Sequence, residues 1–213
     1  MKKISKILAA NRSEIAIRIF RAAEESGIKT AAIYSKEDRF AIHRFKTDES
    51  YLVGEGKGPI QAYLDIDSII KIAKDAKVDA IHPGYGFLSE SPELAEQCEK
   101  NDITFIGPSK EILKRFGNKT EAKKVAEEAK VGTVPSVLVT KENLKSVEKE
   151  VEKIGYPVIV KASWGGGGRG MRVVRSSNEL IDQITTAQSE SLKAFGKDEV
   201  FIEKFLEDAA HIE

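Results

Sequence analysis

A run of glycines between two apolar segments is the part of this sequence whose composition most clearly predicts chemistry. It consists of Gly165, Gly166, Gly167, Gly168, Arg169 and Gly170. Glycine within extended structure costs roughly 0.5 to 1 kcal/mol relative to alanine, so four in succession require a compensating role. Glycines also let backbone N–H groups approach a ligand and converge on phosphate oxygens. The run therefore predicts a flap over a triphosphate, and the alternative is a flexible hairpin that binds no ligand.

Positive side chains at the glycine run favour the phosphate interpretation. Lys161 lies at the end of an otherwise apolar segment, where a lysine needs an anionic partner or an exit to solvent. Arg169 places a second positive charge inside the run. A Walker A loop is excluded, because no Gly-Lys-Ser or Gly-Lys-Thr sequence follows and the next predicted element is a strand rather than a helix.

Lys119 is a further candidate for phosphate binding. Asn118 and Glu121 have the spacing of a helix N-cap and its N3 partner, so Lys119 is predicted to lie in the first turn of a helix. The helix dipole disfavours a positive charge there by roughly 0.3 to 1 kcal/mol, and a nearby phosphate would reverse that sign. An exposed, solvated lysine explains the same pattern, and Lys119 taken alone favours that simpler interpretation.

Residues 82–90 are predicted to form a shaped loop at the edge of a sheet. They follow the fourth predicted strand, at the carboxyl edge where open α/β folds place their ligands. One proline and two glycines in this segment would hold Tyr85 and Glu90 in a tight conformation. The loop is therefore a second candidate for ligand binding.

Two histidines and the single cysteine receive structural interpretations. His82 ends a predicted strand, where a hydrogen-bonded structural role is commoner than catalysis. His43 is interpreted in the same way, as part of a mixed helical surface. Cys98 lies in a predicted amphipathic helix and is interpreted as a packing residue rather than a nucleophile.

The scaffold predicted for the first half of the chain is a parallel sheet with crossover helices. Candidate strands are residues 7–10, 30–34, 51–53, 80–82 and 103–106. The apolar faces of two predicted helices consist of Ile66, Ile69, Ile70 and Ala73, and of Ile15, Ile19, Phe20 and Ala23, with Gly27 ending the second helix in a left-handed conformation. The result is a Rossmann-like α/β domain over residues 1–107. It has Asn11-Arg12-Ser13-Glu14 where a G-x-G-x-x-G turn would be needed, so dinucleotide binding is not predicted.

The second half predicts a different, smaller unit. Residues 108–133 have a helical pattern and are interpreted as a connector, and residues 134–205 as a small α+β module. Its candidate strands are residues 136–140, 158–162, 171–175 and 199–204, and its candidate helices are residues 143–153 and 177–194. Ser176 and Glu179 match a capping box for the second of these helices. We find no internal repeat, low-complexity tract or transmembrane run.

Charge and composition exclude several classes of protein. The 213 residues contain 34 basic and 34 acidic side chains, so no overall field would attract a nucleic acid. The 41% hydrophobic and 32% charged residues are typical of a folded soluble protein rather than a disordered or membrane one. A lone cysteine and an N-terminus unlike a signal peptide predict a cytoplasmic location.

Taken together, several segments resemble the biotin carboxylases. They are residues 10–16 (Ala-Asn-Arg-Ser-Glu-Ile-Ala), 82–90, 105–108 and 161–171, and Glu203-Lys204 with the His-Ile-Glu sequence of residues 211–213. The resemblance covers the whole chain, in order and with matching spacing. Within that family, residues 32–38 and 51–57 are most similar to the pyruvate carboxylases.

The resemblance implies an ATP-grasp enzyme that activates bicarbonate with ATP as carboxyphosphate and then carboxylates biotin on a carrier domain. It implies that Lys119 and Lys161 bind phosphates and that the glycine run is the lid. Glu203, Lys204 and Leu206 would line the adenine pocket, largely through backbone groups. The implied ATP-binding residues are Lys119, Lys161, Gly165, Gly166, Gly167, Gly168, Arg169, Glu203, Lys204, Leu206 and His211, and those near biotin and bicarbonate are Tyr85, Gly86 and Glu90.

The resemblance also implies what lies outside these residues. A biotin carboxyl carrier domain, a carboxyltransferase domain and a homo-oligomer are the implied partners. Residues 206–213 would begin a second half of the ATP-grasp, which normally carries the Mg²⁺ ligands and the catalytic residues. Because phosphoryl transfer needs metal to neutralise the phosphates, we expect the 213 residues alone not to turn over.

One departure and several alternatives accompany the resemblance. Ser13 stands where the Asn-Arg-Gly-Glu signature of the family has glycine, which bears on the tightness of that turn more than on activity. The alternatives within the family are acetyl-CoA and propionyl-CoA carboxylases. A nucleotide-binding or assembly module without catalysis is the alternative outside enzymes. A carbamoyl-phosphate synthetase relative is more distant, because the loop of residues 82–90 fits it poorly.

Overall fold

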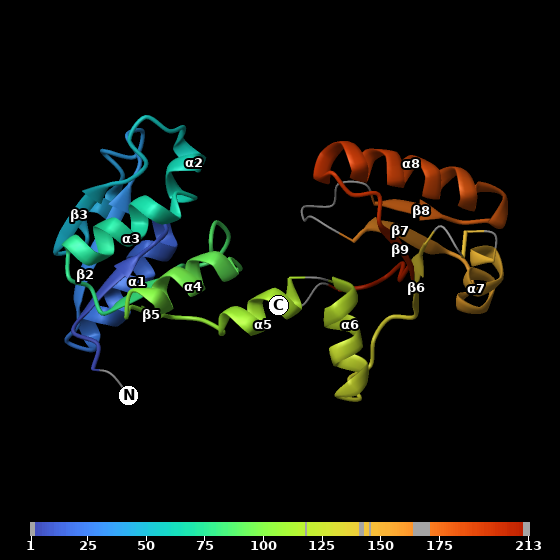
Figure 1. Ribbon diagram of the computed structural model, residues 1–213, viewed down its shortest axis with the longest axis horizontal. Helices are drawn as coiled ribbons and strands as arrows, with labels where there is room; N and C mark the ends of the chain where they lie inside the picture. The colour runs from blue at the N-terminus through green and yellow to red at the C-terminus, as the bar shows by residue number, and fades with distance from the viewer. Residues whose placement is uncertain (1–2, 118, 141–142, 145, 164–170, 211–213) are drawn as a thin grey trace. The chain divides into compact units, whose positions relative to one another are not determined.

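The computed structural model describes residues 3–117, 119–140, 143–144, 146–163 and 171–210. The chain divides into two compact units, Met1–Arg115 and Phe116–Glu213, each with hydrophobic clusters of its own (Figure 1). This division falls within the predicted connector, at the end of helix α5 (Lys110–Phe116) and before helix α6 (Lys119–Glu128). The finer division at residues 107, 133 and 205 stays a prediction.

The first unit is built on a five-stranded parallel sheet, as predicted. Its strands are β1 (Lys6–Ala9), β2 (Lys29–Tyr34), β3 (Glu49–Leu52), β4 (Ala80–His82) and β5 (Thr104–Phe105). Their order in the sheet is β3-β2-β1-β4-β5, and each neighbouring pair is parallel. Strands β2 and β3 therefore follow one another on one side of β1, and β4 and β5 lie on the other side of β1. Such a reversal opens a crevice at the carboxyl ends of the two central strands.

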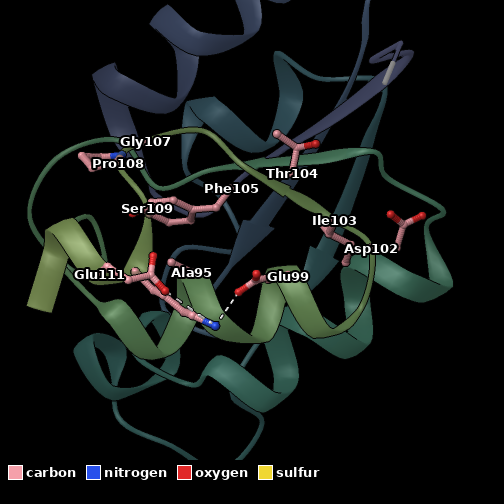
Figure 2. Close-up of a pocket in the computed structure, with 11 residues that line it drawn as sticks. Ala95, Glu99, Asp102, Ile103, Thr104, Phe105, Gly107, Pro108, Ser109 and Glu111 are labelled. Atoms are coloured by element: carbon pink, nitrogen blue, oxygen red, sulfur yellow. Dashed lines mark ion pairs between the residues drawn. The ribbon is translucent and has the colours of Figure 1, made fainter. Parts of the chain in front are cut away.

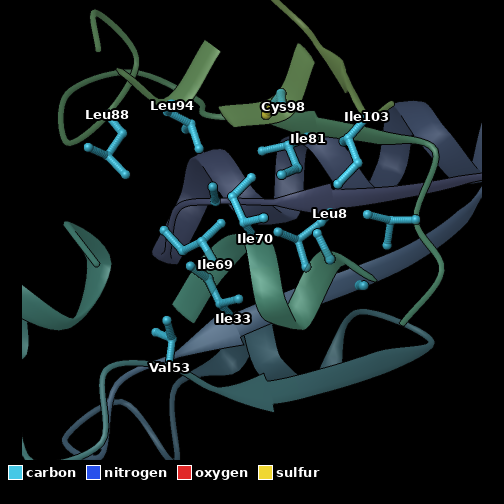
Figure 3. Close-up of a cluster of buried hydrophobic side chains, with 14 of the residues drawn as sticks. Leu8, Ile33, Val53, Ile69, Ile70, Ile81, Leu88, Leu94, Cys98 and Ile103 are labelled. Carbon is cyan, nitrogen blue, oxygen red and sulfur yellow. The ribbon is translucent and has the colours of Figure 1, made fainter. Parts of the chain in front are cut away.

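Helices cover both faces of this sheet. They are α1 (Ser13–Glu25), α2 (Pro59–Tyr63), α3 (Ile66–Asp75) and α4 (Pro92–Lys100), with a 3-10 helix η1 (Ile42–Phe45) after β2. Side chains alternate along a strand, so Leu8 points to one face while Ile7 and Ala9 point to the other. The Leu8 face packs against α3 and α4 (Figure 3), and the Ile7 face packs against α1.

Both apolar helix faces predicted for this unit are buried. In α3 the buried residues are Ile69, Ile70 and Ala73, and in α1 they include Ile19, Phe20 and Ala23. Gly27 has φ +69°, the left-handed conformation predicted for the residue that ends α1. The Asp65 side chain caps α3 by accepting a hydrogen bond from the Ser68 backbone N–H.

The second unit is built on a four-stranded antiparallel sheet, which confirms the predicted α+β module. Its strands are β6 (Ser136–Val139), β7 (Val158–Ala162), β8 (Arg172–Val174) and β9 (Val200–Lys204), in the order β6-β9-β7-β8. The helices α7 (Val147–Ile154) and α8 (Ser177–Phe195) pack on one face of the sheet around Val158, Val160 and Ile202. Among the helices described in the chain, none combines the length and apolar character needed to cross a bilayer.

The capping box predicted for α8 does not form among the described residues, and the other predicted box includes a residue outside them. Ser176 is the N-cap residue of α8, but among the described residues there its hydroxyl donates to the Glu179 carboxylate, 2.9 Å away, instead of accepting a backbone N–H. Asn118, which the second box requires, lies outside the described residues.

Candidate functional site

The face of the second sheet opposite α7 and α8 carries the first candidate site. Side chains alternate along β7, so Val158, Val160 and Ala162 enter the core while Lys161 points to the opposite face. Glu203 of β9 lies on that face as well, because its neighbour Ile202 is buried in the core. We call this the Lys161 face.

Lys161 has an anionic partner, one of the two possibilities that the sequence left open. Its Nζ lies 2.5 Å from Oε2 of Glu203, on the adjacent antiparallel strand. The Lys161 side chain remains 28% exposed, whereas that of Glu203 is 12% exposed. The lysine is therefore fixed by its partner and still accessible to a ligand.

A second lysine, which no sequence motif singled out, shares the same carboxylate. Lys123 of α6 pairs with the other oxygen of Glu203, Oε1, and its Nζ lies 5.4 Å from the centre of the Phe201 ring. The only signal in the sequence was its position, one helical turn after Lys119. That spacing places both positions on one side of α6.

The charges of this cluster suit an anionic ligand. Burial alone would raise the pKa of Glu203, but hydrogen bonds from Lys123 and Lys161 outweigh burial and hold that pKa below its usual value. The carboxylate is thus ionised at neutral pH. Two positive charges face a single negative one, which leaves a net positive charge on the Lys161 face.

The other predicted ATP-binding residues divide between those that the structure describes and those that it does not. The Lys204 ammonium donates to the carbonyls of Gly155 and Tyr156, each 3.0 Å away, so its side chain is held by its own protein. Leu206 is 54% exposed, and Lys119 is the first residue of α6. Gly165, Gly166, Gly167, Gly168, Arg169 and His211 lie outside the described residues.

The second candidate site lies in the first unit, at the carboxyl ends of β1 and β4. The buried Asn11 side chain follows β1, and its Nδ2 donates to the carbonyls of Pro83 (2.7 Å) and Tyr85 (2.8 Å), in the loop after β4. One amide therefore ties together the two loops at the strand-order reversal. In the sequence, Asn11 stood out only as part of a motif.

A pocket of about 270 Å³ opens beside this tie. It is lined by Asn11, Arg12, Ser13, Glu14, Ile15, Tyr85, Gly86 and Phe87. Tyr85 and Gly86 of the predicted biotin end thus line a cavity, and Glu90 lies further along the same loop, outside this described lining. The Tyr85 hydroxyl donates to the Glu14 carboxylate, which lowers the pKa of Glu14 and raises that of Tyr85.

Arg12 is held rigidly at this pocket. Its guanidinium pairs with Asp38 at 3.1 Å and lies 5.5 and 5.6 Å from the centres of the Tyr63 and Phe87 rings. The two rings are stacked, with centroids 5.1 Å apart. Burial would raise the pKa of Asp38, but hydrogen bonds from Tyr63 and Arg12 outweigh it and lower that pKa. Arg12 therefore has fixed partners on several sides.

Ser13 adopts the conformation that a glycine would favour. Its φ is +58°, in the left-handed region that costs an L-amino acid energy. The turn that begins α1 is therefore kept in spite of the serine.

The interpretation of His43 was wrong in its location, while those of His82 and Cys98 are confirmed. His43 is fully buried in η1, with Nε2 3.1 Å from the Ile33 carbonyl, because the short 3-10 helix folds back onto β2. His82 Nδ1 accepts from the Gly84 N–H at 3.0 Å, a structural contact. Cys98 is buried in α4, and burial raises the pKa of its thiol to about 12.

A larger pocket of the first unit lies apart from the predicted residues. Figure 2 shows this cavity of about 480 Å³ between α4, β5 and the start of α5, where Lys110 pairs with Glu99 at 2.7 Å. The described residues that line it include none of the predicted site residues. In the described part of the chain there is also no group of three or more His, Cys, Asp or Glu side chains that could hold a metal ion.

Sequence comparisons divide the chain in the same region as the structure does. Residues 3–113 match the family described as biotin carboxylase, N-terminal domain, and residues 118–213 match the carbamoyl-phosphate synthase L chain, ATP binding domain. Pyruvate carboxylase of Bacillus subtilis is 56% identical over 212 residues, and the human mitochondrial pyruvate carboxylase is 50% identical. Each match covers 100% of this chain and 18% of the relative, so the chain spans less than a fifth of their length.

Solved structures agree with these matches. A Campylobacter jejuni biotin carboxylase in complex with β,γ-ATP has a TM-score of 0.87 and 40% identity, covering 97% of this chain and 46% of that one. A Rhizobium etli pyruvate carboxylase variant has a TM-score of 0.83 and 54% identity, covering 97% of this chain and 18% of that one. The model of the biotin carboxylase N-terminal domain matches more than half of the residues, and the two solved structures have the same fold as this chain. This chain therefore belongs to the biotin carboxylase family.

Proposed function

We propose that this chain is the N-terminal part of the biotin carboxylase of a pyruvate carboxylase. In the whole protein, ATP would activate bicarbonate as carboxyphosphate, biotin on a carrier domain would be carboxylated, and pyruvate would become oxaloacetate. The observation that carries this proposal is the Lys161 face, where a partly exposed lysine is fixed on the strand that leads into the glycine run. The identities to pyruvate carboxylases support the choice of acceptor over acyl-CoA carboxylases.

We assign the residues of the nucleotide site as follows. Lys119 and Lys161 bind phosphates, and Gly165–168 with Arg169 close over them as a lid. Glu203, Lys204 and Leu206 line the adenine pocket, with His211 nearby. Since the Lys204 ammonium is bound by two backbone carbonyls, its contribution to the nucleotide comes from the backbone.

The loop after β4 is assigned to the second substrate. Tyr85, Gly86 and Glu90 would lie at the biotin and bicarbonate end of the active site. The pocket beside Asn11 and the hydrogen bond between Tyr85 and Glu14 support a ligand-binding site there. The two hydrogen bonds from Asn11 hold the loop in position.

The cofactors proposed for the whole protein are ATP, Mg²⁺ and biotin. The net positive Lys161 face fits the phosphates of a nucleotide. The described residues offer no cluster that fits a metal ion, so we assign Mg²⁺ ligands to sequence outside them. When bound, Mg²⁺ would neutralise phosphate charge. The part proposed for the residues of this chain is to bind and orient the nucleotide.

The remaining assignments concern the whole protein. We propose a division into residues 1–107, a connector over 108–133, a lid subdomain over 134–205 and the start of a second ATP-grasp subdomain at 206–213. A biotin carboxyl carrier domain, a carboxyltransferase domain and a second copy of the chain would be its partners. We propose a cytoplasmic location. The alternative is the mitochondrion, which the name of the human relative gives for that protein.

Replacement of Lys161 in the longer carboxylase that contains this chain tests the proposed function. The unaltered protein should form oxaloacetate from pyruvate, bicarbonate and ATP. Lys161→Ala should slow this reaction by roughly a hundredfold, because it removes a charge aimed at the transferring phosphates. Lys124→Ala, on the exposed side of α6, is the matched control and should keep full activity. An unchanged rate for Lys161→Ala would remove this residue from the mechanism.

A further inference from the structure

We propose that Lys123 is a positioning residue that keeps the charge of Lys161 available to the nucleotide. The inference rests on the proposed function, because it concerns the same phosphate site. Two lysines each pair with one oxygen of the same carboxylate. Oε2 of Glu203 pairs with Lys161, and Oε1 pairs with Lys123.

Lys123 is held by two different segments of the second unit, strand β9 and the residues just before β6. Besides Glu203 of β9, its Nζ contacts the Val134 carbonyl just before β6, at 3.3 Å, and lies over the Phe201 ring. The side chain is 22% exposed. These contacts fix both the ammonium and the helix α6 that carries it. An exposed lysine with only solvent for a partner would show none of them.

The division of the carboxylate has an electrostatic consequence. With Lys123 in place, the Glu203 charge is shared and the Lys161 face keeps a net positive charge. Without Lys123, the Glu203 carboxylate would face Lys161 alone, and the remaining pair would be neutral. A neutral pair attracts a phosphate more weakly than a cluster with a net positive charge does. Lys123 thus shares Glu203 with Lys161, and the paired Lys161 keeps more of its positive charge to attract phosphate.

A purely structural role for Lys123 makes a different prediction. If the lysine only tethers α6 to the sheet, its loss should lower stability, and removal of the Glu203 charge should not help nucleotide binding. If it balances charge, removing the Glu203 charge as well should restore the net positive Lys161 face. The double variant Lys123→Met/Glu203→Gln therefore separates the two roles. Methionine keeps most of the length of the lysine stem and removes its ammonium group, with both its charge and its hydrogen bonds.

The experiment is an ADP titration, followed by isothermal titration calorimetry, of the longer carboxylase that contains this chain. Lys123→Met should raise the dissociation constant for ADP about tenfold, as expected when one partner of a charge pair is removed. Lys123→Arg should stay within about threefold of the unaltered protein, because it keeps the charge. The double variant should recover most of the loss. Lys124→Met, with the same substitution at an exposed neighbour, should bind normally.

Three results would overturn the inference in distinguishable ways. Equal affinities for Lys123→Met and the unaltered chain, alongside a loss in Lys161→Met, would leave the proposed function standing and remove Lys123 from it. A loss in Lys123→Met that the double variant fails to recover would reduce Lys123 to a tether. No ADP binding by the unaltered carboxylase would overturn the proposed nucleotide site itself. Circular dichroism spectra of each variant ensure that only folded proteins are compared.

Discussion

Ser13 is a residue whose identity conflicts with its backbone. It has φ +58° at the start of α1, where an L-amino acid pays roughly 1 to 2 kcal/mol and glycine does not. Ser13→Gly should therefore raise the free energy of unfolding by about 0.5 to 1 kcal/mol, after allowing for the greater freedom of glycine in the unfolded chain. Urea denaturation measures this. Ser13→Ala keeps the strain and should give no gain, so a gain of equal size from alanine would contradict the explanation.

Glu203 makes a pH-dependent contribution to stability. Its pKa is lowered in the folded chain from the ordinary value of 4.5, so the folded state favours the charged form. The stabilisation is present above pH 4.5 and is lost as the pH falls through the folded pKa. Glu203→Gln should lower the free energy of unfolding at pH 7 by about 1 to 3 kcal/mol.

The decisive quantity for Glu203 is the difference in the free energy of unfolding between the unaltered protein and Glu203→Gln. It should shrink as the pH is lowered, because the unaltered protein loses the charge that the variant lacks. Denaturant titrations from pH 7 down to the lowest pH at which both proteins fold would show this. A difference that stays constant over that range would mean that the carboxylate charge does not stabilise the fold.

At the scale of elements, Asn11 joins the loops that follow β1 and β4. Asn11→Ala would leave two carbonyls without their donor in a buried place and should cost about 1 to 3 kcal/mol. Hydrogen exchange of residues 82–90 should accelerate as well. Asn101→Ala is a suitable control, because Asn101 donates to one carbonyl within its own helix end and holds no second loop. Equal exchange in residues 82–90 for both variants would contradict the role of Asn11.

The elements themselves were largely predictable from the sequence. All nine strands that the structure describes lie within two residues of the predicted ranges, because short apolar runs that alternate with helical segments indicate strands. His43 was expected on a helical surface, and its burial in the short helix η1 was missed. A 3-10 turn of four residues has no periodicity of its own, and only the packing onto β2 decides its position.

The candidate sites were predictable only in part, for a physical reason. Lys161 stood out because a charge at the end of an apolar strand is costly. Glu203 entered through family resemblance alone, and its pairing with Lys161 depends on the register of β7 with β9, which no local pattern encodes. Lys123 was missed for the same reason, since an ion pair between a helix and a distant strand leaves no mark in either segment.

At the scale of the whole molecule, the chain divides into two units with separate cores. The predicted phosphate residues belong to the second unit, and the predicted biotin residues to the first. We expect the 213 residues alone to form no carboxybiotin from ATP, bicarbonate and free biotin, because the family resemblance assigns the Mg²⁺ ligands that phosphoryl transfer needs to the second half of the ATP-grasp. Carboxybiotin formation above that of an enzyme-free control would contradict this expectation.

The central claim is that the Lys161 face and the glycine run bind the phosphates of ATP. Backbone amide chemical shifts of the 213-residue chain, recorded during titration with ATP, test it most directly. We predict shifts that concentrate in β7, in β9 and in residues 164–170, and that are lost in Lys161→Ala. Shifts confined to the first unit, or a response unchanged by Lys161→Ala, would contradict the account.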